Sequence, residues 1–132
     1  MALMQWNDSL ATGHPRIDSE HKKLVDLINK LADAMAAGKA KDICGQVLSE
    51  LFQYTKTHFA MEEQLMANYR YVNTAEHKAE HDKLVNDVLV FKEKFDAGSL
   101  TLSISLLKFL QDWLTNHIKV SDKTLVAAIA TR

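Results

Sequence analysis

The sequence has 132 residues, of which 25% are charged and 47% hydrophobic, and its 16 basic and 17 acidic residues give a formal net charge of −1. This length suits one domain with one core, and we expect that domain to cover residues 1–132. The balanced charge argues against nucleic acid or an anionic membrane as a partner, because either favours a clustered basic excess.

The chain shows neither a membrane-spanning run nor the pattern of a secretion signal. No apolar run approaches the roughly 20 residues needed to cross a bilayer, and residues 1–15 lack a basic segment followed by an apolar stretch. The single cysteine, Cys44, cannot form an internal disulfide or a cysteine-rich zinc site. We therefore predict a cytoplasmic protein that does not insert into a membrane.

Two helices are predicted in the first half of the chain. The first covers residues 18–37, where apolar residues repeat at the four-three-four spacing of one helical face, and Gly38 follows as a stop. The second covers residues 41–68 with the same spacing, although Gly45 weakens the prediction near its start. Both apolar stripes also carry polar residues, which are His21 in the first helix and His58 and Glu62 in the second.

Two further helices are predicted in the second half. The third begins after Asn73, which together with Glu76 forms a variant of the capping box, and it ends at Gly98. The fourth covers residues 102–120 and is followed by Asp122 and a short apolar tail. The polar residues on these two stripes are His77 and His81 in the third helix and His117 in the fourth.

These four segments predict an all-α protein. Three short connections make successive helices antiparallel neighbours, and four helices with one apolar stripe each close most simply as an up-down-up-down antiparallel four-helix bundle. Residues 1–16 are too few for a domain, and we expect this N-terminal arm to pack over one end of the bundle with Trp6 as its anchor. A short C-terminal tail completes the predicted fold.

The inward histidines indicate a metal site. One histidine on an apolar face is usually a core residue bonded to a neighbour, but five of them on four stripes change that expectation. His58 and Glu62 are four residues apart, as are His77 and His81, so each pair projects from one side of its helix. Unpaired polar groups are costly among apolar residues, and a bound cation would satisfy them.

The predicted ligands limit the choice of metal. Imidazoles with carboxylates and no thiolate suit iron, manganese or zinc rather than calcium or copper(I). Seven inward groups exceed the about four ligands that zinc prefers, so two ions are indicated. Asp122 fits least well, because five residues beyond His117 a regular helix has turned about 140° past the same face. Only a helix that ends or loosens near Val120 would bring both side chains inward. On spacing alone, a solvated aspartate near the C-terminus is the favoured alternative for Asp122.

On these residues the sequence resembles the single-domain bacterial hemerythrins, or bacteriohemerythrins. The resemblance covers essentially the whole chain, with the matching groups in family order and one group per helix. It rests on Ile17-Asp18 followed by His21, on His58 with Glu62, on His77 with His81, and on His117 with Asp122. The resemblance implies a non-heme di-iron centre that binds dioxygen reversibly.

The resemblance also implies a role for each ligand. His77, His81 and His117 would hold one iron, His21 and His58 the other, and Glu62 and Asp122 would bridge both. Five imidazole bonds and four carboxylate bonds fill nine of the twelve positions of two octahedral irons, and the bridging hydroxide or oxide of the family fills two more. One position, on the iron with two histidines, remains for dioxygen.

Residues next to the ligands are expected to wall the oxygen pocket, although each of them also suits the bundle core. They are Leu24, Phe59, Trp113, Leu114 and Ile118. The expected function is oxygen storage, transport or delivery without enzymatic activity, with an oxygen-consuming enzyme as one conceivable recipient. The balanced charge is compatible with a monomer, which we expect.

Two other functions compete with this hypothesis. Di-iron oxidases and peroxidases of the ferritin-like type use Glu-x-x-His pairs, which this sequence lacks. A sensor of oxygen, redox state or nitric oxide usually carries an attached output domain. We expect no room for such a domain in 132 residues, although a partner protein could supply it.

Overall fold

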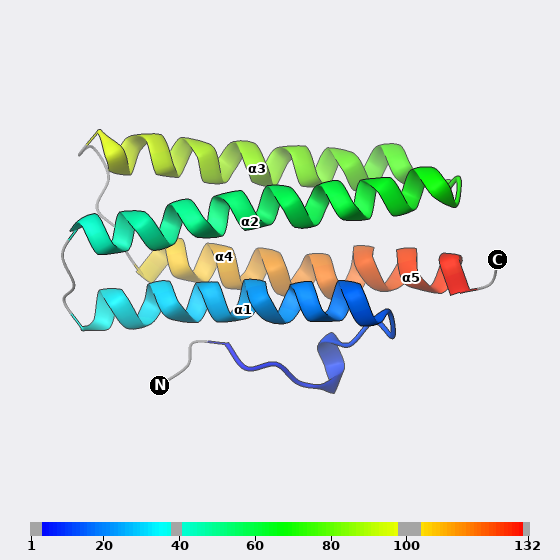
Figure 1. The fold of residues 1–132 in the computed structure, drawn as a ribbon, viewed down its shortest axis with the longest axis horizontal. Helices are drawn as coiled ribbons and strands as arrows, with labels where there is room; N and C mark the ends of the chain where they lie inside the picture. The colour runs from blue at the N-terminus through cyan, green and yellow to red at the C-terminus, as the bar shows by residue number, and fades with distance from the viewer. Residues whose placement is uncertain (1–3, 38–40, 98–103, 131–132) are drawn as a thin grey trace.

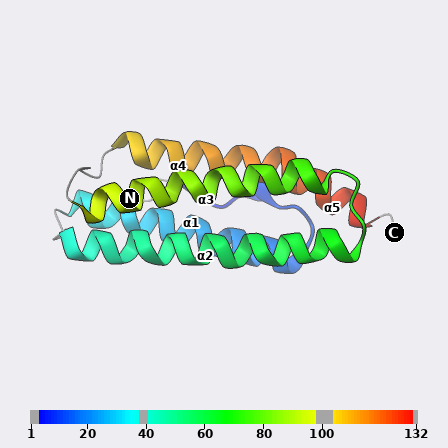
Figure 2. The ribbon, with the colours of Figure 1, turned by 90° about the horizontal axis from the view of Figure 1, so that it is seen from above.

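The computed structural model describes residues 4–37, 41–97 and 104–130. Its helices lie side by side and alternate in direction (Figures 1 and 2), which confirms the predicted four-helix bundle. The predicted stops at Gly38 and Gly98 and the predicted start at Leu102 lie outside the described residues. The helices of the bundle are α1 (Pro15–Ala36), α2 (Lys41–Asn68), α3 (Thr74–Asp96) and a fourth that comprises α4 (Ile104–Asn116), η2 (His117–Asp122) and α5 (Lys123–Ala130).

The first helix begins inside the predicted arm of residues 1–16. Pro15 occupies the first turn of α1, where a missing N–H costs nothing because it would have no helical partner. His14 caps the helix, and its Nδ1 accepts a hydrogen bond of 3.3 Å from the backbone N–H of Ile17. The arm therefore ends at His14.

The arm lies along the side of α1 (Figure 1) and not over one end of the bundle as predicted. Met4 and the side chain of Asn29, in the middle of α1, exchange two hydrogen bonds of 2.8 Å. Met4 and Leu10, the last residue of the short helix η1 (Asp8–Leu10), are buried, whereas Trp6 is only half-buried. Met4 and Leu10 are thus the most deeply buried anchors of the arm, and Trp6 adds a shallower contact, because its ring packs against the main core beneath the ammonium group of Lys22.

Two sequence signals have local explanations. The second helix continues through Gly45. A Cβ at this position would lie 3.0 Å from Cε1 of Phe95 in α3, so the glycine permits the Phe95 side chain to pack closely against α2. Asn73 occupies the cap position of α3, but its side chain makes no capping hydrogen bond. The predicted capping box is therefore wrong, and the Thr74 hydroxyl instead donates a bond of 2.6 Å to the carbonyl of Tyr71.

The predicted C-terminal tail is helical. In α5, Leu125 packs with Met66 and Tyr71, and Val126 packs with Ile17 and Met61 in a second cluster. Burying these apolar side chains stabilises the helix and extends the core to the end where α1 begins and α2 ends. No helix among the described residues combines the length and apolar character needed to cross a membrane.

Candidate metal centre

Seven polar side chains from the four helices of the bundle meet inside the end that α5 closes. None is more than 3% exposed, although buried imidazoles and carboxylates are costly without partners. They are the seven ligands predicted from the sequence, with His21 in α1, His58 and Glu62 in α2, His77 and His81 in α3, and His117 and Asp122 in η2.

The η2 segment explains how His117 and Asp122 share a face. This segment is a π-helix, in which backbone hydrogen bonds span five residues, and the N–H of Lys123 accordingly donates to the carbonyl of Ile118. The wider turn brings the residue five positions farther along the chain back above the first. His117 Nε2 consequently lies 3.1 Å from Asp122 Oδ1.

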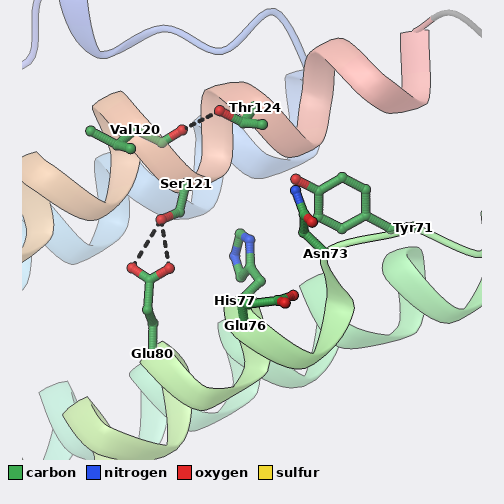
Figure 3. Close-up of a pocket in the computed structure, with 8 residues that line it drawn as sticks. All are labelled: Tyr71, Asn73, Glu76, His77, Glu80, Val120, Ser121 and Thr124. Atoms are coloured by element: carbon green, nitrogen blue, oxygen red, sulfur yellow. Dashed lines mark hydrogen bonds between the residues drawn. The ribbon is translucent and has the colours of Figure 1, made fainter.

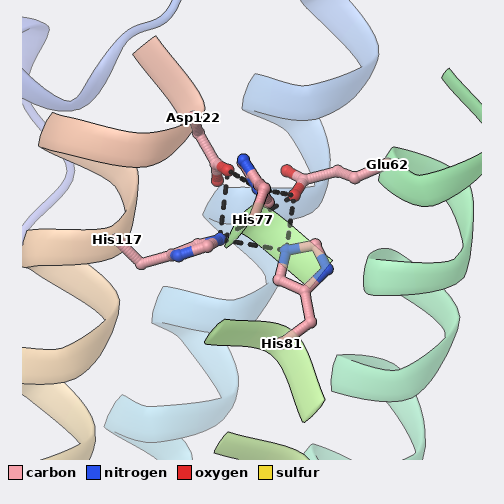
Figure 4. A group of neighbouring side chains, drawn as sticks. All are labelled: Glu62, His77, His81, His117 and Asp122. Atoms are coloured by element: carbon pink, nitrogen blue, oxygen red, sulfur yellow. Dashed lines mark hydrogen bonds and ion pairs between the residues drawn. The ribbon is translucent and has the colours of Figure 1, made fainter. Parts of the chain in front are cut away.

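The donor atoms form two groups that share both carboxylates. Within each group, one donor atom from every residue lies within 4.8 Å of the others. Glu62 and Asp122 belong to both groups. The first group adds three histidines, which are His77, His81 and His117 (Figure 4), and the second adds two, which are His21 and His58.

The carboxylate of Asp122 turns one oxygen towards each group. Its Oδ1 lies 3.0 Å from His77 Nε2 and 3.1 Å from His117 Nε2, both in the first group. Its Oδ2 lies 2.7 Å from His21 Nε2 in the second group.

The carboxylate of Glu62 also turns one oxygen towards each group. Its Oε1 lies 3.0 Å from His81 Nε2 in the first group, and its Oε2 lies 3.0 Å from His58 Nε2 in the second. Two carboxylates that each present one oxygen to either group have the arrangement needed to bridge two cations.

Many of the inward atoms lack a hydrogen-bond partner among the described residues. These atoms are His21 Nε2, His58 Nε2, Glu62 Oε2 and both side-chain oxygens of Asp122. They lie close to one another, but their angles do not suit hydrogen bonds. Buried polar groups are nearly always satisfied, so converging lone pairs without protons between them fit bound cations.

Without a cation, the cluster is held together by protonated imidazoles next to carboxylates. Burial opposes protonation of the histidines, but hydrogen bonds to carboxylates outweigh it and raise the pKa of His58 to about 9 and that of His117 to about 10. Burial and the charge of Glu62 would raise the pKa of Asp122, but the histidines close to its two oxygens, at 2.7 Å for His21 and 3.1 Å for His117, hold it well below its usual range. Metal binding would displace these protons.

Three glutamates hold the outer nitrogens of three of the histidines. Each glutamate comes from the helix that precedes the histidine's helix in the chain. The pairs are Glu20 Oε1 with His58 Nδ1 at 2.7 Å, Glu63 Oε2 with His81 Nδ1 at 3.1 Å, and Glu80 Oε1 with His117 Nδ1 at 3.4 Å. Such partners keep the proton on Nδ1, orient the ring and leave Nε2 for a metal.

These three glutamates were not predicted from the sequence. Because one residue along a helix turns the side chain by about 100°, they lie beside the inward stripes and face the neighbouring helices. The signal that could have found them is adjacency, since Glu20 precedes His21, Glu63 follows Glu62 and Glu80 precedes His81.

An apolar cavity of about 20 Å³, room for about one small molecule, lies inside the bundle and is lined by residues close in sequence to the histidines of the cluster. Of the predicted pocket residues, Leu24, Trp113 and Leu114 line it. Thr55, which was not predicted from the sequence, brings the one hydroxyl group among the lining residues. Four residues of the lining each stand three positions from a ligand histidine, one per helix, and they are Leu24, Thr55, Leu84 and Leu114.

The other two predicted pocket residues do not line this cavity. Phe59 stacks flat on the ring of His81, with 3.8 Å between the ring centroids and an angle of 3°. Ile118 is fully buried in the main core. Both residues therefore support the ligand-bearing helices from outside the cavity.

Comparisons with known proteins agree with this geometry. Residues 12–129 match the model of the hemerythrin HHE cation binding domain. The chain is 40% identical over 124 residues to a bacteriohemerythrin of Methylococcus capsulatus, covering 93% of this chain and 94% of that protein. It is 38% identical over 129 residues to a bacteriohemerythrin of Pseudomonas aeruginosa, covering 98% and 83%. A crystal structure of wild-type hemerythrin is similar with a TM-score of 0.92 at 38% identity, covering 96% of this chain and 98% of that chain.

Proposed function

The chain belongs to the hemerythrin family, and on that premise we propose that its two ligand groups hold two iron ions and bind dioxygen reversibly, for storage, transport or delivery. The observation that carries this proposal is the orientation of the Glu62 and Asp122 carboxylates. Each of them turns one oxygen towards the first group and the other oxygen towards the second. A site for a single ion does not require two carboxylates that each present their two oxygens to different groups of histidines.

The two groups differ in the number of histidines. His77, His81 and His117 would hold one iron, and His21 and His58 would hold the other, with both carboxylates shared. The ion with two histidines has one protein ligand fewer, so it offers the position for an incoming ligand. When bound, the iron pair would supply that position and the electrons that dioxygen takes up.

The ligand set favours reversible binding over oxidation of a substrate. Five neutral imidazoles and two carboxylates provide fewer anionic donors than the Glu-x-x-His sites of ferritin-like bundles, so they stabilise high-valent iron less. The sequence contains no Glu-x-x-His pair. A carrier or store without enzymatic activity fits this site best.

The apolar cavity supports the same function. Leu24 and Leu114 would keep water and anions away from the ligands, because transfer of a polar or charged molecule into an apolar space is unfavourable. Dioxygen is small, neutral and apolar, so it can occupy this space without that cost.

Metal analysis tests the proposal. Protein loaded with ferrous iron without air should contain about two irons per chain, because two ligand groups are present. One tightly bound zinc per chain with no uptake of iron would contradict the di-iron site.

A further inference from the structure

Two surface pockets of about 310 Å³ each reach a ligand histidine from outside. The first, which we call the α3–η2 pocket, lies between those two elements (Figure 3), and His77 lines it. The second, the α2–α3 pocket, is lined by His81. The cluster itself is buried. In the part of the chain that the structure describes, these two pockets are therefore candidate routes by which metal ions reach it from solvent.

The α3–η2 pocket surrounds its histidine with oxygen atoms. Glu76 and Glu80 stand one turn apart on α3, and the hydroxyl of Ser121 lies 2.9 and 2.8 Å from the two carboxylate oxygens of Glu80. The ring of His77 stands between Glu80 and Tyr71 (Figure 3). Carboxylates and hydroxyls are ligands that a hydrated divalent cation accepts in exchange for water.

His77 has a free polar edge although its side chain is only 3% exposed. Its Nε2 faces Glu62 and Asp122, whereas no described residue hydrogen-bonds to its Nδ1. Its ring meets those of Tyr71, His81 and His117 at steep angles of 77°, 84° and 78°, so no ring lies flat against it.

The α2–α3 pocket suits a cation less well. Glu63 holds the Nδ1 of His81 at 3.1 Å, and Phe59 stacks flat on the same ring, so this histidine is fixed. The ammonium group of Lys56, which also lines this pocket, would repel a cation.

Both walls of the α3–η2 pocket carry ligands of the cluster. The α3 wall supplies His77, and Ser121 in the η2 wall immediately precedes Asp122. An ion held by Glu76 and Glu80 would therefore exchange water first for His77 and then for Asp122 without crossing the apolar core.

We propose that the α3–η2 pocket is the port through which hydrated ferrous iron reaches the metal-free cluster. The inference rests on the proposed function, in that iron is the metal that the cluster holds. The step is a ligand exchange in which Fe(II) gives up water for side-chain donors, so it needs no oxidant or reductant.

Three variants of the full chain separate this port from its alternatives. Glu76→Gln removes a charge from the α3–η2 pocket, and Asp82→Asn removes the same charge from the α2–α3 pocket on the same helix. Thr124→Trp narrows the α3–η2 pocket without changing its charge. Iron uptake is followed by mixing metal-free protein with Fe(II) without air, stopping the reaction with a chelator and counting protein-bound iron against time. Iron loss from loaded protein to the chelator gives the reverse rate.

Glu76→Gln and Thr124→Trp should each slow uptake about three- to tenfold, with about two irons per chain at the end. Iron loss should slow by the same factor, since the affinity is unchanged and both directions use one route. Added salt should weaken the effect of Glu76→Gln and leave that of Thr124→Trp, because salt screens exposed charges. Asp82→Asn should exchange iron at the parental rate.

If Glu76→Gln and Thr124→Trp both lose iron at the parental rate, the proposed port is wrong. It is also wrong if Asp82→Asn is the one variant that exchanges iron more slowly. Iron loss is measured on folded, loaded protein, so it decides the question even where folding limits uptake. A parental chain that binds no iron would overturn the proposed function and the port together, whereas normal loading at unchanged rates overturns the port alone.

Discussion

Glu20 of α1 lies 2.7 Å from the Nδ1 of His58 in α2, which is the shortest of the three outer glutamate–histidine bonds. Burial would raise the pKa of Glu20, but hydrogen bonds with His58 and Arg16 lower it, so the carboxylate stays ionised. It therefore holds the His58 proton on Nδ1 and leaves Nε2 facing the ligand cluster.

Loss of this partner should weaken iron binding without removing a ligand. We expect Glu20→Ala to lower iron affinity about 10- to 100-fold, and Glu20→Gln to lower it less because the amide oxygen still accepts the bond. Chelator competition measures the affinity. Glu50→Ala, at an exposed glutamate paired with Lys30 and distant in sequence from the cluster, is the matched control. Parental affinity in Glu20→Ala would show that His58 needs no support.

The two carboxylates that face both groups, Glu62 and Asp122, should determine how many ions the cluster holds. Asp122→Asn keeps the side-chain shape but removes one of the two carboxylates of the cluster, so we expect iron content to fall from about two to about one per chain or below. Asp112→Asn, on the exposed face of α4, should retain both irons. Two irons in Asp122→Asn would mean that this carboxylate does not bridge.

The stability of the iron-free chain should depend on pH through the same residues. The pKa of His58 and that of His77 are raised from 6.5 to about 9, because hydrogen bonds to carboxylates outweigh burial, so their contribution is full below 6.5 and is lost as pH rises through about 9. Glu62 has a lowered pKa despite burial, so its contribution is full above 4.5 and is lost on acidification.

Melting of the iron-free chain should therefore shift to lower temperature between about pH 6.5 and 9. The iron-loaded chain should not lose stability over that range, since metal binding requires unprotonated imidazoles, and it should melt higher throughout. Thermal melts of both forms at several pH values test this. A melting temperature of the iron-free chain that rises with pH, or equals that of the loaded chain, contradicts the prediction.

Leu114 should protect the bound state. It is 3% exposed and lines the cavity three residues before His117, so Leu114→Ala would leave a gap that its neighbours fill only partly. We expect faster autoxidation and faster azide binding, with iron content unchanged because no ligand is altered. The control is Leu107→Ala, a buried position about two turns farther from the metals. Parental rates in both variants would make Leu114 an ordinary core residue.

The helices and the inward position of the ligands follow from the periodicity of the sequence. An apolar stripe fixes which face of a helix is buried, so His21, His58 and His77 had to point inward once the stripes formed a bundle. Adjacent helices then bring these side chains together, because the short connections force antiparallel packing.

The rest depends on features that periodicity does not contain. The π-helix at η2 adds one residue to a turn, and no propensity of residues 117–122 marks that turn, so Asp122 fitted the predicted stripe poorly. The role of Glu20 depends on which helix lies beside α1, which is a tertiary relationship. The course of the arm likewise depends on tertiary contacts with side chains of α1, since Asn29 bonds to Met4 and Asp18 accepts bonds from Thr12.

Reversible oxygenation tests the central claim most directly. Iron-loaded protein is reduced without air, exposed to dioxygen and then deoxygenated under inert gas, while its visible absorption is recorded through several cycles. We predict an absorption band that appears with dioxygen and disappears on its removal, with uptake of about one dioxygen per two irons. This prediction follows from the two shared carboxylates, the five histidines and the nearby apolar cavity. A single irreversible change, with iron left oxidised after the first exposure and no recovery on deoxygenation, would contradict the account.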